Sequence, residues 1–171
     1  MKLIRYLTRD DLVIIVEEYR HYFKALDDPL PDFALCNTDK IDSIIAIPQK
    51  TFGGKELYPT LYQKAACYFY FINKLHPFFN GNKRLSIFVT SIFFMMNNYE
   101  LTYSDEKLYQ FARRITISKD DQSDELENIA LDLAEHTKPV QDAWMYLRQT
   151  WVLVTNLFQN ITLRGGMQLK K

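Results

Sequence analysis

The chain has 171 residues, of which 47% are hydrophobic and 15% aromatic, and this composition is typical of a globular domain with a buried core. Lysine plus arginine (21) equals aspartate plus glutamate (21), so the formal net charge is zero. A general nucleic-acid binder shows a basic surface, and we therefore expect no direct nucleic-acid partner.

The two cysteines, Cys36 and Cys67, form neither a disulfide framework nor a metal-ligand pattern, which favours a reducing compartment. The first ten residues lack the hydrophobic stretch of a secretory signal peptide. The longest apolar runs, near residues 87–96 and 151–154, are too short to span a bilayer. We expect a soluble, cytoplasmic protein with no membrane partner, and no particular oligomeric state is indicated.

Helical patterns begin near the N-terminus. Thr8, with Asp11 three residues later, predicts a capped helix that fades near Ala25. A short helix is expected over residues 39–46, ended by Pro48.

Residues 50–58 differ from the helical segments, because polar and aromatic residues flank the Gly53-Gly54 pair. Adjacent glycines between such residues are typical of a tight turn. This segment predicts a small β-hairpin, or flap.

Helical periodicity returns over residues 60–75, and residues 84–97 are so apolar that they predict a nearly fully buried central helix. Two further helices are expected over residues 105–118 and 123–136. Thr137 and Pro139 are then expected to open a long final helix, since proline fits the first helical turn. The sequence thus predicts an all-α fold, a helical bundle around a buried central helix, with a small β-hairpin flap.

The most informative segment runs from His76 to Arg84 and reads HPFFNGNKR. A connection between two buried helices is usually short and chemically plain, whereas this one carries an imidazole, two amides, a glycine and two cations. The backbone amides at the start of a helix bind anions, and Gly81 would let a phosphate approach them. Lys83 and Arg84 add positive charge, and His76 can accept a proton at neutral pH. This combination predicts phosphoryl or nucleotidyl transfer to a hydroxyl.

The pattern HPFxxGNKR resembles the signature of the Fic/Doc (death-on-curing) family, most closely that of its Doc-like branch. Residues 52–60 (FGGKELYPT) and 64–66 (KAA) also resemble Doc-like proteins, so that the likeness extends over about residues 7–136. It implies the Fic fold, with a Fic/Doc-like domain over residues 1–138. Residues 139–171 would form a C-terminal helical extension packed on the same domain.

The resemblance also implies an activity, the transfer of a phosphate or a nucleotide (AMP) from ATP, or another NTP, with Mg²⁺. The acceptor would be a Ser, Thr or Tyr hydroxyl of a target protein, and the protein would be a toxin whose partner is an antitoxin. His76 would be the catalytic base. Phosphate and nucleotide binding would fall to five residues: Lys74, Gly81, Asn82, Lys83 and Arg84. The flap residues Thr51, Phe52, Gly53 and Gly54 would bind the target by strand-like pairing.

Two positions depart from the family pattern. Asn80 stands where the family usually has an aspartate or glutamate that binds the metal, and a neutral amide oxygen is a weaker Mg²⁺ ligand, acting through the bound nucleotide. Lys83 stands where AMP-transferring relatives have glycine, which slightly favours phosphate transfer. Two functions therefore remain open: an active transferase, or a catalytically impaired pseudoenzyme that binds nucleotides or peptides.

Overall fold

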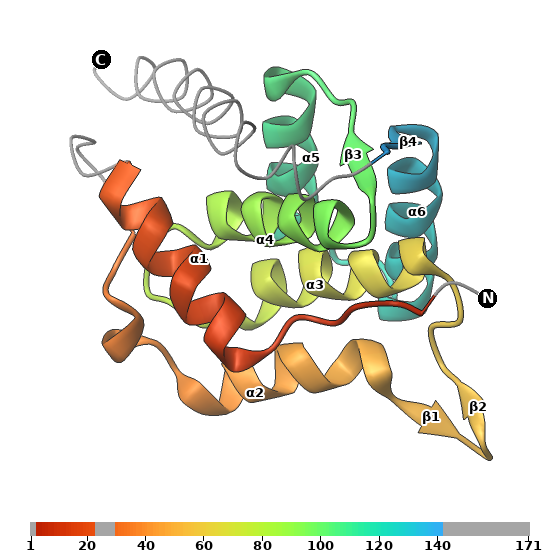
Figure 1. The fold of residues 1–171 in the computed structure, drawn as a ribbon, viewed down its shortest axis with the longest axis horizontal. Coiled ribbons are helices and arrows are strands. Elements are labelled where there is room, and N and C mark those ends of the chain that lie inside the picture. The colour runs from red at the N-terminus through yellow and green to blue at the C-terminus, as the bar shows by residue number, and fades with distance from the viewer. Residues whose placement is uncertain (1–2, 23–29, 142–171) are drawn as a thin grey trace.

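The computed structural model describes residues 3–22 and 30–141. Within these residues the fold is mainly helical, with two small antiparallel sheets of two strands each (Figure 1). The helices are α1 (Arg9–Tyr22), α2 (Thr38–Ala46), α3 (Leu61–Leu75), α4 (Asn82–Met96), α5 (Asp105–Ile117) and α6 (Gln122–Glu135). Two short 3-10 helices are η1 (Phe33–Leu35) and η2 (Ile47–Gln49). The strands are β1 (Thr51–Phe52), β2 (Lys55–Glu56), β3 (Tyr99–Leu101) and β4 (Thr137–Pro139).

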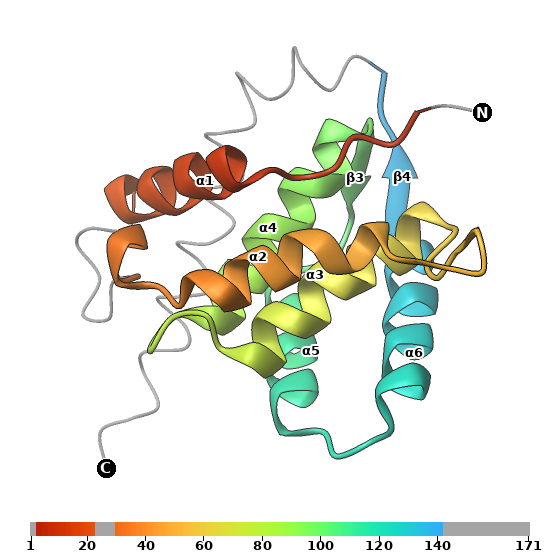
Figure 2. The same cartoon turned by 90° about the horizontal axis from the view of Figure 1, so that it is seen from below.

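Helices α3 and α4 lie side by side in the centre of the molecule (Figures 1 and 2). Helix α1 packs on α4 and α2 packs on α3, while α5 contacts both central helices and α6 packs on α3. Every residue of α3 from Lys64 to Asn73, and of α4 from Arg84 to Met95, is buried. The predicted buried central helix is confirmed as α4, and α3 shares its burial.

Local sequence signals explain where α1 and α3 begin. The Thr8 N–H donates to Asp11 Oδ2 at 2.8 Å, and the Asp11 N–H donates back to Thr8 Oγ1 at 3.2 Å. Thr60 and Gln63 form the same reciprocal arrangement at the start of α3. Such capping boxes satisfy amides that have no partner within the helix. The predicted end of the first helix near Ala25 lies outside the described residues.

The predicted final helix is wrong at its start, because Thr137–Pro139 form β4. This strand pairs antiparallel with β3, with Tyr99 opposite Pro139 and Leu101 opposite Thr137. A residue that precedes proline, as Lys138 does, disfavours helical backbone, and β3 offers a strand edge to pair with. The expected extension from residue 142 onward lies outside the described residues, and the division of the chain at residue 138 stays a prediction.

Among residues 3–22 and 30–141, no helix combines the length and apolar character needed to cross a membrane.

Candidate active site

The loop between α3 and α4 is held by unusual backbone at both ends. His76 caps the C-terminus of α3 with φ 48° and ψ 69°, in the left-handed region, and its side chain lies at the surface. Gly81 precedes the first residue of α4 with φ 78°. The two left-handed residues turn the chain sharply, so that the expected catalytic base lies within a few residues of the start of α4.

Phe78 and Asn82 fix the middle of the loop. Phe78 is 2% exposed, and its ring meets that of Phe33 edge to face at 6.3 Å between ring centres. The Asn82 side chain accepts from the Phe78 N–H at 3.1 Å and donates to the Phe78 carbonyl at 2.6 Å. Asn82 therefore shapes the loop from inside, with a side chain that is itself buried.

Asn82 also contacts the histidine, with Nδ2 lying 3.3 Å from His76 Nδ1. Its two bonds to Phe78 fix which side of the amide is the NH₂ group, so Nδ2 is the donor and Nδ1 the acceptor in the neutral ring. This contact is the longest of the three described for the Asn82 side chain, and therefore the weakest. The Nδ1 lone pair thus faces the first residue of α4.

The surroundings of His76 keep the imidazole uncharged. Partial loss of water around the ring lowers the pKa of His76 below the usual 6.5, and the positive charges of Lys83, Lys40 and Lys74 lower it further. At neutral pH the ring can therefore accept a proton.

Helix α2 also contributes to the site, although nothing in the sequence indicated it. The Asn37 N–H donates to the Pro77 carbonyl at 2.8 Å, and Lys40 Nζ lies 3.5 Å from the His76 carbonyl oxygen. No motif surrounds Asn37 or Lys40 in the sequence. Only the packing of α2 beside the loop assigns these residues to the site.

Glycine at position 81 is required by close packing, and not by the approach of a phosphate as expected. A Cβ atom there would lie 2.5 Å from Leu30 Cδ1, so the space beside Gly81 is filled by a buried leucine and is not open for a phosphate. The Gly81 N–H donates to Asn80 Oδ1 at 2.6 Å, and this amide is therefore not available to an anion in the described arrangement. The predicted anion site narrows to the amides that follow Gly81.

Those amides open α4. The Leu85 N–H makes a helical bond to the Gly81 carbonyl at 2.9 Å, so the Asn82 and Lys83 amides precede the helical ladder, and Gly81 has no side chain to cap them. Arg84 is 9% exposed, and its Nη2 lies 3.6 Å from the position that a Gly81 Cβ would take. The guanidinium thus lies at the start of α4, and Lys83 is partly exposed beside it.

Lys74 lies at the edge of this group. Its Nζ donates to the Ser118 carbonyl at the end of α5, at 2.6 Å, and lies 5.7 Å from the centre of the Tyr70 ring. Its charge contributes to the lowered pKa of His76, while its ammonium is engaged with α5. A direct role at the phosphates stays a prediction.

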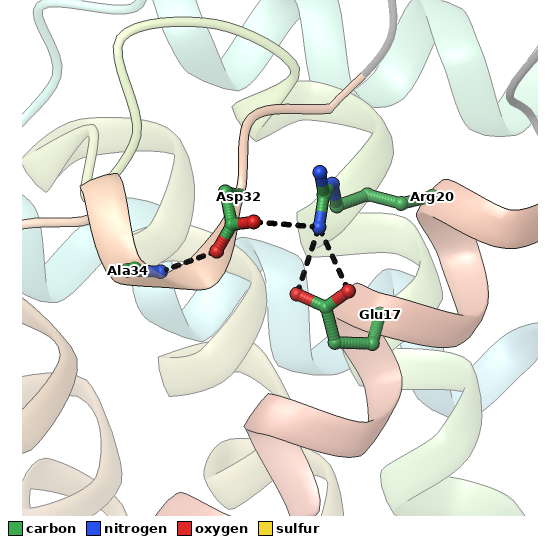
Figure 3. Close-up of polar contacts among 4 residues, drawn as sticks. All are labelled: Glu17, Arg20, Asp32 and Ala34. Carbon is green, nitrogen blue, oxygen red and sulfur yellow. Dashed lines mark hydrogen bonds and ion pairs between the residues drawn. The ribbon is translucent and has the colours of Figure 1, made fainter.

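The segment that packs against the loop, Leu30–Phe33, is anchored to α1 (Figure 3). Arg20 Nη1 donates to both carboxylate oxygens of Glu17, at 2.9 and 2.7 Å, and to Asp32 Oδ2 at 3.0 Å. Asp32 Oδ1 accepts from the Ala34 N–H at 2.9 Å and so begins η1. This pairing positions both Leu30, against Gly81, and Phe33, against Phe78.

An open hollow of about 580 Å³ lies beside the loop, between α1 and the segment around η1. Leu30, Leu35 and Phe79 contribute its apolar lining, and Arg20 lies among its charged residues. Phe79 belongs to the loop and is 81% exposed. The volume is within the usual range of small-molecule sites.

The predicted flap is confirmed as a hairpin. Strands β1 and β2 pair antiparallel, and the turn residues Gly53 and Gly54 have φ 57° and 75°, the left-handed values that two-residue hairpin turns require. All six residues from Thr51 to Glu56 are exposed, and Phe52 is 79% exposed.

The structure does not bring the hairpin and the loop together. The hairpin precedes the N-terminus of α3 and the loop that begins with His76 follows its C-terminus, and both views place the hairpin and this loop at opposite ends of the helix (Figures 1 and 2). A helix of 15 residues is about 22 Å long. The predicted target-binding residues Thr51 to Gly54 therefore form a separate surface from the predicted catalytic group.

Comparisons with curated proteins and with solved structures find no match to this chain. A family model described as the Fic/DOC family matches residues 6–94, just over half of the chain. The matched residues include the glycine hairpin, the whole of α3 and the loop from His76 to Arg84. Fic/DOC proteins are typically transferases. By this match, the chain belongs to the Fic/DOC family.

Proposed function

We propose that this chain transfers a phosphate or AMP from ATP, with Mg²⁺, to a Ser, Thr or Tyr hydroxyl of a target protein. The observation that carries the proposal is the placement of an uncharged histidine beside the cationic start of a buried helix. A base next to an anion site is the minimum that transfer from a nucleotide to a hydroxyl requires.

The anion site consists of the first amides of α4, the Arg84 guanidinium and the Lys83 ammonium. Amides at a helix N-terminus carry partial positive charge and stabilise the charge that develops on phosphate oxygens. Arg84 can grip two phosphate oxygens through its planar fork, whereas Lys83 acts as a compact charge.

His76 takes the proton of the target hydroxyl as its oxygen attacks phosphorus. One O–P bond forms and the bond from that phosphorus to the bridging oxygen breaks, so that ADP leaves after attack at the γ-phosphorus and pyrophosphate leaves after attack at the α-phosphorus. The Asn82 contact makes Nδ1 the acceptor of the neutral ring, and the imidazole turns away from Asn82 so that the target hydroxyl replaces the 3.3 Å contact. Because this is the weakest of the Asn82 contacts, the exchange leaves the two bonds that shape the loop intact.

The loop fits Mg²⁺ only weakly. Residues 76–84 include no carboxylate, and the Asn80 Oδ1 already accepts from the Gly81 N–H. Mg²⁺ usually binds through one or two carboxylates together with the phosphates. Asn80 would therefore be a neutral ligand of an ion held mainly by ATP, and when bound the ion would neutralise phosphate charge.

The same observation favours a second candidate, a Fic-fold pseudoenzyme that binds a nucleotide or a peptide without efficient turnover. In this case the Arg84 and Lys83 group still binds phosphates, but the weak metal site limits transfer.

The proposed partners are a protein target and an antitoxin, in a cytoplasmic setting. Their support is the family membership and, for the target, the exposed hairpin. Since the hairpin and His76 lie at opposite ends of α3, the target must extend over about 20 Å to touch both.

The test is transfer of label to protein in a cell lysate, with ATP labelled at the α- or the γ-phosphate. Transfer from γ-labelled ATP identifies a phosphotransferase, and transfer from α-labelled ATP identifies an AMP transferase. ATP binding without either transfer indicates the pseudoenzyme. A chain that neither transfers label nor binds ATP in calorimetry contradicts both candidates.

Asn80→Asp separates the two candidates further. The added carboxylate should tighten Mg²⁺ and raise the initial rate at limiting Mg²⁺, because anionic oxygen is the better ligand. The measurement is the initial rate against Mg²⁺ concentration for both proteins. A rate in the parent that is independent of Mg²⁺, with no gain in the variant, would show that Asn80 is not a weakened metal ligand.

A further inference from the structure

Lys64 is fully buried in α3 although it carries a positive charge. Removing an ammonium from water costs several kcal/mol unless other groups replace that water. The proposed chemistry does not use this residue, because it lies in the first turn of α3, while His76 follows the last turn.

The ammonium of Lys64 has three partners. Nζ donates to the Pro48 carbonyl at 3.3 Å and to Glu56 Oε2 at 3.1 Å, and it lies 5.3 Å from the centre of the Tyr6 ring. An ammonium has three N–H donors, so two hydrogen bonds and one ring face use its full capacity.

Two of these partners lie on either side of the hairpin. Pro48 belongs to η2, shortly before β1, and Glu56 is the last residue of β2. The hairpin has no apolar face in contact with the core, since its residues are all exposed. A two-stranded hairpin without such a face is marginally stable in water. One ammonium therefore links the segment before β1 and the end of β2 to α3, beside strands that have no apolar support of their own.

Stability alone does not account for this arrangement. Replacing a buried ion pair by a well-packed apolar residue is often neutral or stabilising, and a methionine would fill much of the space of the lysine stem. The ammonium instead fixes the orientation of the hairpin, because its bonds to Pro48 and Glu56 define where the segment before β1 and the end of β2 lie.

We propose that Lys64 is the positioning residue of the hairpin. It holds β1 and β2 in a fixed orientation on α3, ready for a target segment to pair with them. This inference rests on the proposed target-binding role of the hairpin. Lys64 acts through Glu56 and Pro48, and it touches neither the nucleotide nor the reacting atoms.

The two ends of the ion pair should respond differently to mutation. The Glu56 side chain is 48% exposed, so Lys64→Met leaves a carboxylate that water can solvate. Glu56→Gln instead leaves a fully buried ammonium without a charged partner. We expect both variants to loosen the hairpin, and Glu56→Gln to lower the melting temperature more than Lys64→Met.

The first experiment is hydrogen–deuterium exchange of the full chain, followed in peptides that cover residues 49–60. The Leu57 N–H, which donates to the Lys50 carbonyl at 2.9 Å, reports pairing at the base of the hairpin. We expect about tenfold faster exchange there in Lys64→Met, Glu56→Gln and the double variant, with unchanged exchange over residues 76–84. The matched control is Lys138→Met, which removes a surface lysine 3.5 Å from Glu100 on the other sheet. Hairpin exchange equal to the parent in Glu56→Gln overturns the proposal, even if Lys64→Met does not fold.

The second experiment measures steady-state transfer with a target protein. We expect KM for the target to rise several-fold while kcat and the Kd for ATP stay constant. The Lys64→Met and Glu56→Gln effects on KM should also be less than additive, because both act through one contact. A looser hairpin with an unchanged KM overturns the positioning role. If the parent itself transfers nothing, the proposed function fails, while the exchange result still decides whether Lys64 orders the hairpin.

Discussion

At its C-terminal end α3 runs into a loop that is tied to several other elements, whereas at its N-terminal end it follows a hairpin that is exposed along its whole length. In the loop, Phe78 and Asn82 are buried, and η1 and α2 supply contacts to it. The hairpin is joined to the core mainly through groups at its base. The proposed chemistry is therefore organised by the fold itself, whereas the proposed target recognition depends on a few contacts. The two functions should therefore be separable by mutation.

The largest expected effect is that of His76→Ala, set against Phe52→Ala in the hairpin. Losing the base should reduce the transfer rate by about 10²–10⁴-fold and leave target binding intact. Phe52→Ala should raise KM for the target and leave kcat unchanged, because the hairpin lies at the far end of α3. Initial rates over a range of target concentrations measure both quantities. A normal rate in His76→Ala would remove the proposed mechanism.

Arg84→Ala should weaken ATP binding, and Lys83→Ala should weaken it less. Arg84 is nearly buried at the start of α4, and losing a charge-assisted bond to phosphate costs about 1.5–3 kcal/mol. Lys55→Ala in the hairpin should leave the affinity unchanged. Isothermal calorimetry measures the affinity for ATP of the three variants and the parent. Equal affinities for the parent and Arg84→Ala would contradict the proposed phosphate site.

Gly81→Ala and Gly54→Ala compare how tightly the two regions are packed. Both glycines have positive φ, so alanine costs about 1–2 kcal/mol at either position. A Cβ at Gly54 meets open space, whereas at Gly81 it would lie 2.5 Å from Leu30 Cδ1, which adds about 1–3 kcal/mol of overpacking. Chemical denaturation should therefore show the larger loss of unfolding free energy for Gly81→Ala. Equal losses would mean that Leu30 moves aside freely.

The smallest expected effect concerns pH. Transfer requires uncharged His76, so the rate should fall as pH drops through the pKa of His76, which lies below 6.5. Lys40→Met removes a positive charge that disfavours the imidazolium, so this pKa should rise and the acid limb of the kcat/KM profile should move to higher pH by less than about one pH unit. Lys55→Met in the hairpin serves as the control and should leave the profile in place. A shift to lower pH in Lys40→Met would contradict the assignment of the limb to His76.

Much of the fold could be predicted from periodicity and capping. The helices expected over residues 105–118 and 123–136 are observed as α5 (Asp105–Ile117) and α6 (Gln122–Glu135), and the glycine pair correctly indicated a hairpin. These features depend on neighbours in the chain. The strand at Thr137–Pro139 depends instead on β3, nearly forty residues earlier, and its proline is equally typical of the first turn of a helix.

The residues of the site differ in the same way: some could be predicted from the local sequence, and others only from tertiary packing. The residues of the loop could be named from HPFFNGNKR, because the segment itself carries the chemical groups. Lys40, which lowers the pKa of His76, and Leu30, which explains Gly81, come from elements that reach the loop only through tertiary packing. The separation of the hairpin from the loop, by contrast, follows from the predicted helix over residues 60–75, which connects them and is observed as α3.

The backbone of His76 has a consequence for how this protein can change over evolutionary time. A left-handed residue at the end of a helix is most often glycine, because a side chain at positive φ is strained by about 1 kcal/mol or more. Glycine at position 76 would relieve that strain and make the folded protein more stable, while removing the imidazole. Selection for stability and selection for the proposed chemistry therefore act in opposite directions at this residue. A descendant that no longer needed the reaction would gain stability by replacing His76 with glycine.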